Sequence, residues 1–166
     1  MSLYLHVPFC RQACHYCDFH FSLNLNKKEE MVRSMLLEME AWASRQRFPQ
    51  MQSVYFGGGT PSILGPEAID LLLNRAKQLF DLAPDAEITL EANPDDLIIH
   101  TPEQWKKLGI NRFSIGVQSF NDKFLRRLNR SHSAEQAKNA IALAAAAGFE
   151  KCSLDLMFGL PGQTLQ

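Results

Sequence analysis

The feature that most constrains the fold is an alternation of short apolar runs with longer, helix-like segments. Helical patterns separate five apolar runs that we expect to be buried strands, at residues 2–7, 53–56, 87–91, 112–117 and 151–156. Repeated β–α units with short connections predict parallel strands and right-handed crossovers in one α/β domain over residues 1–166. The pattern alone does not separate a doubly wound sheet from a curved, barrel-like sheet.

The helical segments carry start and stop signals. We expect helices to begin at the capping residues Asn26, Thr101 and Ser133, and at Pro66, which suits the first helical position. Gly109 is expected to end the third helix in the left-handed conformation. Apolar spacing predicts two core-facing stripes: Met31, Met35, Met39 and Trp42 in the first helix, and Ile69, Leu72, Leu73, Ala76 and Phe80 in the second.

Three cysteines, Cys10, Cys14 and Cys17, follow the first predicted strand with the spacing C-x3-C-x2-C. Three thiolates on one tight loop can hold three corners of an iron–sulfur cube and leave the fourth iron without a protein ligand. Zinc and copper(I) also accept soft sulfur ligands, and His15 or His20 could complete a zinc site, although no second ligand pair follows. Free or disulfide-bonded thiols are a further alternative, which the lack of a secretory signal disfavours.

Composition and charge narrow the function classes. A formal net charge of −1 gives no reason to expect a nucleic-acid or anionic-membrane partner. The longest apolar tract, residues 141–148, is too short to span a bilayer. The N-terminus has no basic segment followed by an apolar one, so we expect a cytosolic protein. Because the sequence stops soon after the fifth strand, we expect a fragment of a longer protein.

Unusual residues follow all five predicted strands. In barrel enzymes the functional groups lie on the loops at the C-terminal ends of the strands. The features that converge on this rim are the cysteine loop, the run Gly57–Pro61, Glu91, Gln118, and Asp155 with the turn at residues 159–162. Their agreement across five strands is stronger evidence for a site than any one of them.

Each feature also has a structural interpretation. The glycines could form a tight turn, although they would equally let backbone approach a ligand. Glu91 could be a solvated charge or could bind an ammonium or ribose hydroxyl. Asp155 lies in an apolar strand, and a buried carboxylate needs partners, which favours a function. Arg130 could pair with a ligand carboxylate or form a surface ion pair. We expect core positions for His6 and His132, and a packing role for Cys152.

Taken together, the motifs resemble the radical S-adenosylmethionine superfamily. The similarity is to its oxygen-independent coproporphyrinogen III oxidase group, especially the haem-chaperone branch. It rests on Tyr4, the cysteine loop with Tyr16, and the stretches 57–61, 91–94, 116–120, 129–130 and 155–162.

The resemblance implies an open, partial (β/α)6 barrel with five β–α units present and with the rest of the barrel and a following domain missing. Cys10, Cys14 and Cys17 would then ligate a [4Fe-4S] cluster, whose open iron binds S-adenosylmethionine. The cluster would cleave this ligand to methionine and a 5′-deoxyadenosyl radical. Its implied contacts are Tyr4, Gly58, Thr60, Glu91, Gln118, Arg130 and Asp155.

One departure from the oxidase pattern distinguishes between the oxidase proper and the haem-chaperone branch. The oxidase proper resembles C-x3-C-x2-C-x-C, whereas here Phe19 stands at the position of the fourth cysteine. This pattern is similar to that of the haem chaperones, which pass haem to acceptor proteins. The implied partners are haem or a porphyrinogen, an electron donor and an acceptor protein. Oxidative decarboxylation of coproporphyrinogen III is the enzymatic alternative, and a zinc-stabilised binding module is the third hypothesis.

Overall fold

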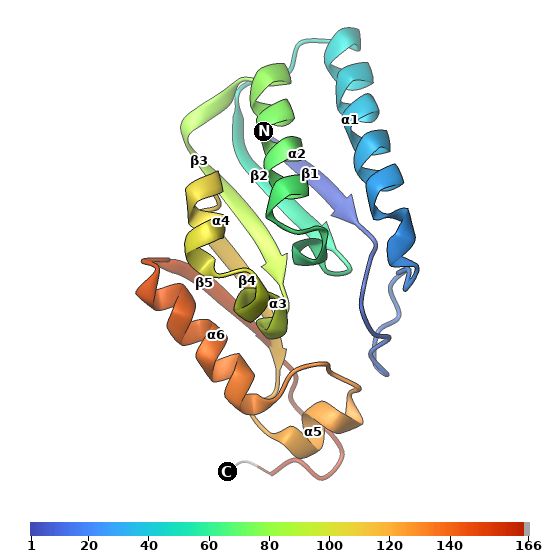
Figure 1. The fold of residues 1–166 in the computed structure, drawn as a ribbon, viewed down its shortest axis with the longest axis vertical. Coiled ribbons are helices and arrows are strands. Elements are labelled where there is room, and N and C mark those ends of the chain that lie inside the picture. Colours follow the sequence, from blue (N-terminus) through green and yellow to red (C-terminus); the bar gives the residue numbers. More distant parts are fainter. Residues whose placement is uncertain (165–166) are drawn as a thin grey trace.

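The computed structural model describes residues 1–164 and contains one parallel sheet with helices between its strands (Figure 1). The strands are β1 (Ser2–Val7), β2 (Met51–Gly58), β3 (Leu82–Ala92), β4 (Arg112–Gln118) and β5 (Lys151–Leu156). The helices are α1 (Lys28–Arg45), α2 (Pro66–Leu79), α3 (Pro94–Ile99), α4 (Pro102–Leu108), α5 (Asp122–Arg127) and α6 (Ala134–Ala146). Two 3-10 turns, η1 (Leu25–Lys27) and η2 (Pro61–Leu64), precede α1 and α2.

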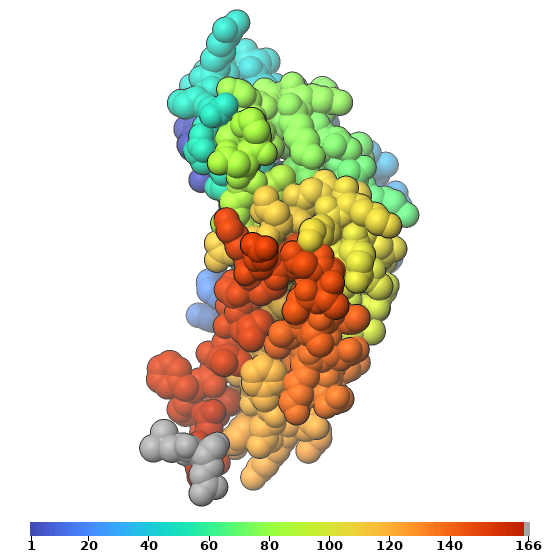
Figure 2. All heavy atoms as spheres, turned by 90° about the vertical axis from the view of Figure 1, so that its left-hand side faces the viewer, coloured from blue at the N-terminus to red at the C-terminus, as the bar shows by residue number. Residues whose placement is uncertain are grey.

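The strand order decides between the two architectures that the sequence left open. The strands pair in parallel in the order β1-β2-β3-β4-β5. A doubly wound sheet reverses its strand order at a switch point, and this sheet does not. Right-handed crossovers that always advance to the next strand place the helices on one face, which gives the predicted partial barrel. The molecule is elongated, with its N-terminal elements at one end and its C-terminal elements at the other (Figure 2).

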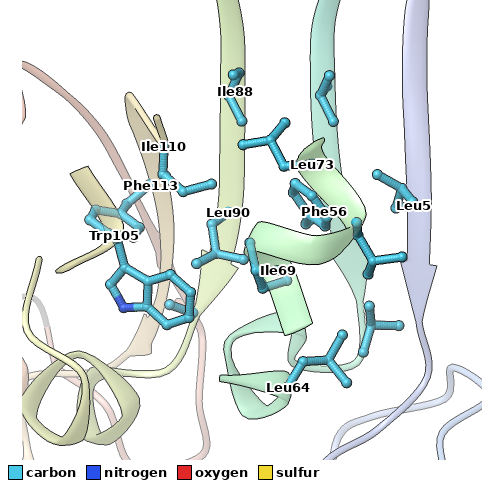
Figure 3. Close-up of a cluster of buried hydrophobic side chains, with 14 of the residues drawn as sticks. Leu5, Phe56, Leu64, Ile69, Leu73, Ile88, Leu90, Trp105, Ile110 and Phe113 are labelled. Carbon is cyan, nitrogen blue, oxygen red and sulfur yellow. The ribbon is translucent and has the colours of Figure 1, made fainter. Parts of the chain in front are cut away.

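The face of the sheet beneath the helices forms the core. Leu5, Phe56, Leu90 and Phe113 are register partners in four neighbouring strands and are almost fully buried (Figure 3). They pack in one apolar cluster with Trp105 and the α2 stripe. All five predicted stripe residues of α2 are buried. In α1 the prediction fails at Trp42, which is 47% exposed, although Met35 and Met39 are buried.

Most predicted helix ends are present. Thr101 and Ser133 each form a capping box, and Pro66 opens α2. Gly109 ends α4 at φ +104°, in the left-handed region. The predicted cap at Asn26 is wrong, because Asn26 lies inside η1 and α1 begins two residues later without a side-chain cap. No helix in the described part of the chain combines the length and apolar character needed to cross a bilayer.

Three burial predictions on the outer strands are also wrong. His6, Cys152 and Asp155 are exposed. β1 and β5 are the edge strands of the sheet among residues 1–164. His6 points away from the face that the helices cover, whereas its neighbours Leu5 and Val7 point into the core. β5 pairs only with β4 and is largely exposed on both faces, which leaves Cys152 and Asp155 open to solvent.

Candidate functional site

A cavity of about 270 Å³ lies at the C-terminal ends of the strands. Nine of the ten predicted site residues line it: Cys10, Cys14, Cys17, Gly58, Thr60, Glu91, Gln118, Arg130 and Asp155. Its wall therefore includes residues that follow β1 and β2 and residues from the ends of β3, β4 and β5. The parallel sheet explains this convergence, since parallel strands all end at the same edge.

Tyr4 is the predicted site residue that the structure places outside this cavity wall. Its ring stacks on Tyr55 with a centroid distance of 6.0 Å, and its hydroxyl lies 3.1 Å from His6 Nδ1. Tyr55 in turn donates a hydrogen bond to Glu91, so Tyr4 packs against a residue that supports the cavity wall. Burial, and then the nearby Glu91 charge, raise the pKa of Tyr4.

The three cysteines are half-buried and differ in their neighbours. Thr60 Oγ1 donates to Cys10 Sγ at 3.6 Å, and Arg130 Nη1 donates to Cys14 Sγ at 3.3 Å. The Cys17 amide donates to the Cys14 carbonyl at 3.1 Å, which closes a tight turn. Burial and the neighbouring cysteines raise the pKa of Cys10, and the Thr60 bond opposes that rise. Metal binding at Cys10 requires the deprotonated thiolate.

Residues 127–129, at the end of α5, hold the middle of the cysteine loop. Gln12 Nε2 donates to the Asn129 carbonyl and to Asn129 Oδ1, at 2.8 and 2.7 Å, while Asn129 Nδ2 donates to the Ala13 carbonyl at 2.7 Å. The His15 amide and its Nδ1 meet the carbonyls of Leu128 and Arg127, at 3.1 and 2.9 Å. Asn129 adopts a left-handed conformation, φ +57°, which asparagine tolerates better than most residues.

The glycine run after β2 has a steric reason to lack side chains. The Gly59 and Thr60 amides donate to the carbonyls of Val7 and Phe9, so this run lies against the start of the cysteine loop. A Cβ on Gly59 would lie 2.7 Å from the Phe9 carbonyl oxygen and 2.9 Å from Cys10 Sγ. Gly58 has φ +120°, which side chains disfavour. The glycines therefore serve close approach between two rim loops.

Glu91 is fixed by the neighbouring strand β2. The Tyr55 hydroxyl donates to Glu91 Oε1 at 2.7 Å, and the Gly58 amide donates to Oε2 at 3.0 Å. Burial, followed by the hydrogen bond to Glu91, raises the pKa of Tyr55 to about 12. Each carboxylate oxygen has two acceptor sites, so Glu91 keeps capacity for a donor inside the cavity.

Arg130 spans the cavity wall without a carboxylate partner. Its Nη2 donates to Asn93 Oδ1 at 2.6 Å and to the Gly116 carbonyl at 2.7 Å, while Nη1 approaches Cys14 and the Tyr16 hydroxyl. Arg130 is absent from the ion pairs formed among residues 1–164, and its buried Nε lacks a hydrogen-bond partner there. Burial, opposed by Arg130, raises the pKa of Tyr16 to about 12.

The ends of β4 and β5 complete the wall. Gln118 has φ +65° and follows an irregularity in the pairing with β5, which places it at the rim. Asp155 pairs in register with Gly116, but its carboxylate makes no hydrogen bond or ion pair within residues 1–164. His132, predicted as a core residue, is buried behind this wall and its Nε2 lies 3.0 Å from the Val117 carbonyl. Burial, and then the Arg130 charge, lower its pKa.

Sequence reasoning did not assign several supporting residues to the site. Asn93 binds Arg130, and Gln12 and Asn129 hold the cysteine loop. Asn93 and Asn129 lie in the stretches 91–94 and 129–130, but nothing in the sequence shows which side chains they contact. The short helix α3 was also missed, although Pro94 at its first position and two acidic residues in its first turn are helix-start signals.

The donor set fits an iron–sulfur cluster. Three soft thiols are distributed around one cavity, and hydrogen bonds reach two of their sulfurs; such bonds help to set the potential of Fe–S sites. Mononuclear zinc needs ligands about 2.3 Å from one ion if they are thiolates. Within the described residues, no three Cys, His, Asp or Glu side chains gather around such a position.

A singly wound partial barrel with three cysteines after its first strand defines a class of cofactor-binding protein. The chain belongs to the Radical SAM superfamily, whose sequence profile matches residues 4–166. Membership implies a [4Fe-4S] cluster and S-adenosylmethionine as the ligands of the class.

Within the superfamily, the chain is similar to proteins named as haem chaperones. The chain is 41% identical over 174 residues to a protein of Haemophilus influenzae named "Heme chaperone HemW", and 39% identical over 168 residues to the Escherichia coli protein of that name. Both matches cover 100% of this chain but only 45% and 44% of the relatives. The chain therefore spans less than half the length of these proteins.

Among solved structures, the coproporphyrinogen III oxidase HemN from Escherichia coli, described as a radical SAM enzyme, superimposes with a TM-score of 0.90 at 30% identity. The match covers 98% of this chain and 38% of that one. An archaeal Elp3 from Methanocaldococcus infernus, at 20% identity and a TM-score of 0.59, shares the fold. These matches confirm the predicted partial barrel.

Proposed function

We propose that Cys10, Cys14 and Cys17 hold a [4Fe-4S] cluster and that the adjoining cavity binds S-adenosylmethionine. The observation that carries this proposal is a single cavity whose wall combines the three thiols with Glu91 and Arg130. When bound, the cluster supplies the electron that cleaves the sulfonium of S-adenosylmethionine. The protein supplies binding, orientation and charge.

The polar residues suit the two ends of an amino-acid nucleoside. Glu91, an anchored carboxylate, is suited to accept hydrogen bonds from an ammonium or from ribose hydroxyls. Arg130 has no carboxylate partner in the described part of the chain and is suited to a ligand carboxylate. Backbone at Gly58 and Thr60 lines the same cavity, and Gln118 and Asp155 provide further polar groups. Tyr4 packs on Tyr55, which donates a hydrogen bond to Glu91.

For the whole protein we propose a haem chaperone that passes haem to an acceptor protein. The support is the identity of about 40% to proteins named heme chaperones and Phe19 at the position where the oxidase pattern has a fourth cysteine. Phe19 lines the cavity and is 82% exposed. An electron donor and a cytosolic location belong to the same proposal.

The HemN superposition supports one alternative, oxidative decarboxylation of coproporphyrinogen III. A longer chain containing these residues would decide between the two. After anaerobic reconstitution with iron and sulfide, we expect iron–sulfur absorbance, tight haem binding, and no protoporphyrinogen from coproporphyrinogen III with S-adenosylmethionine and a reductant. Formation of protoporphyrinogen would refute the chaperone proposal. A colourless protein that retains one zinc would refute the cluster.

A further inference from the structure

A buried carboxylate outside the cavity wall contacts the cysteine loop. Asp96, in the first turn of α3, is fully buried. Arg11 Nε and Nη2 donate to Asp96 Oδ1, at 3.1 and 2.7 Å, and Ser62 Oγ donates to Oδ2 at 2.7 Å. Arg11 lies in the loop between Cys10 and Cys14, and its side chain is 37% exposed. We call Arg11, Ser62 and Asp96 the clamp.

The clamp joins three separate connections of the fold. Arg11 comes from the connection after β1, Ser62 from η2 after β2, and Asp96 from α3 after β3. Ser62 and Asp96 are both fully buried, so two members have fixed positions in the interior. Arg11 is the member that belongs to the loop, and its contact with Asp96 restrains the first half of that loop.

The same turn also supports the other side of the thiols. The Asp96 amide donates to the Asn93 carbonyl at 3.1 Å. The side chain of Asn93 accepts from Arg130, which contacts Cys14. One turn, residues 93–96, therefore holds both an arginine inside the cysteine loop and an arginine that crosses the cavity. Gln12 and His15 bind a different segment, at the end of α5, so Arg11 is held independently of them.

We propose that Asp96 is a positioning residue that, through Arg11, holds the cysteine loop in its ligand-binding shape before a cluster is present. This proposal rests on the proposed function, because it assumes that the loop receives a cluster. A loop that is ordered in advance loses less conformational entropy when it binds its cofactor. A buried ion pair is weak evidence for stability, because desolvation offsets its attraction. The main consequence of the clamp is therefore the geometry of the loop.

The first test measures loop order in the metal-free 166-residue protein. Among residues 10–17 the Cys10, His15 and Cys17 amides are hydrogen-bonded. Exchange of the Cys10 amide, next to Arg11, should become about tenfold or more faster in Arg11→Met, the size expected for losing hydrogen bonds between charged groups. Exchange in β2 and β3, which reports global stability, should rise by less than exchange in the loop. Glu40→Gln is the matched control, because it removes the Arg75–Glu40 ion pair between α1 and α2, away from the loop. Equal exchange of residues 10–17 in wild type and Arg11→Met would refute the proposal.

A double variant separates the effect on loop order from a loss of global stability. Arg11→Met leaves Asp96 buried without its cation, whereas Arg11→Met with Asp96→Asn removes both charges. We expect the double variant to recover thermal stability but not protection of residues 10–17. Recovery of both would show that the clamp acts only through global stability.

The second test follows the reconstituted cluster. Iron loss to a chelator should be several-fold faster in Arg11→Met than in wild type and Glu40→Gln, and Arg11→Lys should restore part of the difference. Equal rates in all four proteins would overturn the proposal. Failure of the wild type to take up any cluster would refute the proposed function instead, and the exchange experiment would still decide whether Asp96 orders the loop.

Discussion

Two carboxylates at the same rim, Glu91 and Asp155, differ in how the fold holds them. Glu91 ends an inner strand and accepts hydrogen bonds from Tyr55 and from the Gly58 amide. Asp155 ends an edge strand, is exposed, and has no partner within residues 1–164. The loops on the two sides differ in the same way. The glycine run at the end of β2 contacts the cysteine loop, whereas Gly159, after β5, has open space around it. The side of the cavity near β1, β2 and β3 is thus organised before any ligand binds.

The largest effect is expected at the organised side. Cys14→Ala should abolish cluster retention after anaerobic reconstitution, because the two remaining thiols cannot hold three corners. Cys14 is half-buried on a rim loop, so the free energy of unfolding of the metal-free protein should fall by no more than about 1 kcal/mol. Iron content, visible absorbance and thermal unfolding measure both effects. Unfolding of the metal-free variant would contradict the separation of fold and site.

A pair of glycine substitutions tests the two sides directly. Gly59→Ala should cost about 1–3 kcal/mol of stability, since its Cβ would meet the Phe9 carbonyl and Cys10 Sγ, and should lower cluster content. Gly159→Ala meets no atom within 4 Å but has φ +71°, so about 1–2 kcal/mol of backbone strain is expected, with cluster content unchanged. Denaturant unfolding and iron analysis provide the measurements. Equal cluster loss in both variants would remove the contrast.

Substitutions of Glu91 and Asp155 should distinguish an effect on protein stability from an effect on ligand binding. Glu91→Gln should lower the stability of the metal-free protein by about 1 kcal/mol, since it disturbs two hydrogen bonds. Asp155→Asn should change it by less than about 0.5 kcal/mol. If both contact S-adenosylmethionine as proposed, both variants should bind it more weakly in calorimetry with the reconstituted protein. A stability loss in Asp155→Asn as large as that in Glu91→Gln would show that Asp155 is also held.

The smallest effect concerns pH and Tyr55. Its pKa is raised from 10.0 to about 12 in the folded protein, so the neutral phenol is favoured by folding. The associated stability is present below pH 10 and is lost as pH rises towards 12. Tyr55→Phe should therefore lose less stability than wild type between pH 10 and 12, as followed by denaturant midpoints. Tyr16, whose pKa is also raised to about 12, should leave a smaller loss of stability with rising pH in the Tyr55→Phe variant. Identical slopes would indicate that Tyr55 is not buried against Glu91.

Local signals in the sequence predicted much of the fold and the composition of the rim. Gly109 and the capping boxes at Thr101 and Ser133 act within one turn, so their neighbours in sequence suffice to identify them. The cysteines and Glu91 were located by their place after strands, because parallel strands end at a common edge.

The remaining features depend on contacts far apart in the chain. The exposure of Asp155 and Cys152 depends on whether another element covers β5, which the pattern of that strand does not reveal. Trp42 follows the helical spacing of the core stripe yet lies at its margin. The contact between Arg11 and Asp96 joins residues 85 positions apart. The sequence around either residue does not predict this contact.

The unpaired edges of β1 and β5 have a consequence for access to the cavity. A closed eight-stranded barrel has an interior filled with side chains and receives ligands at its mouth. Within residues 1–164 β1 and β5 do not pair with each other, so this part of the sheet leaves the cavity accessible from the side as well as from the rim. The cavity of about 270 Å³ is therefore bounded by five strand ends and their loops, and residues beyond this sheet can add to its wall on the side of either edge strand.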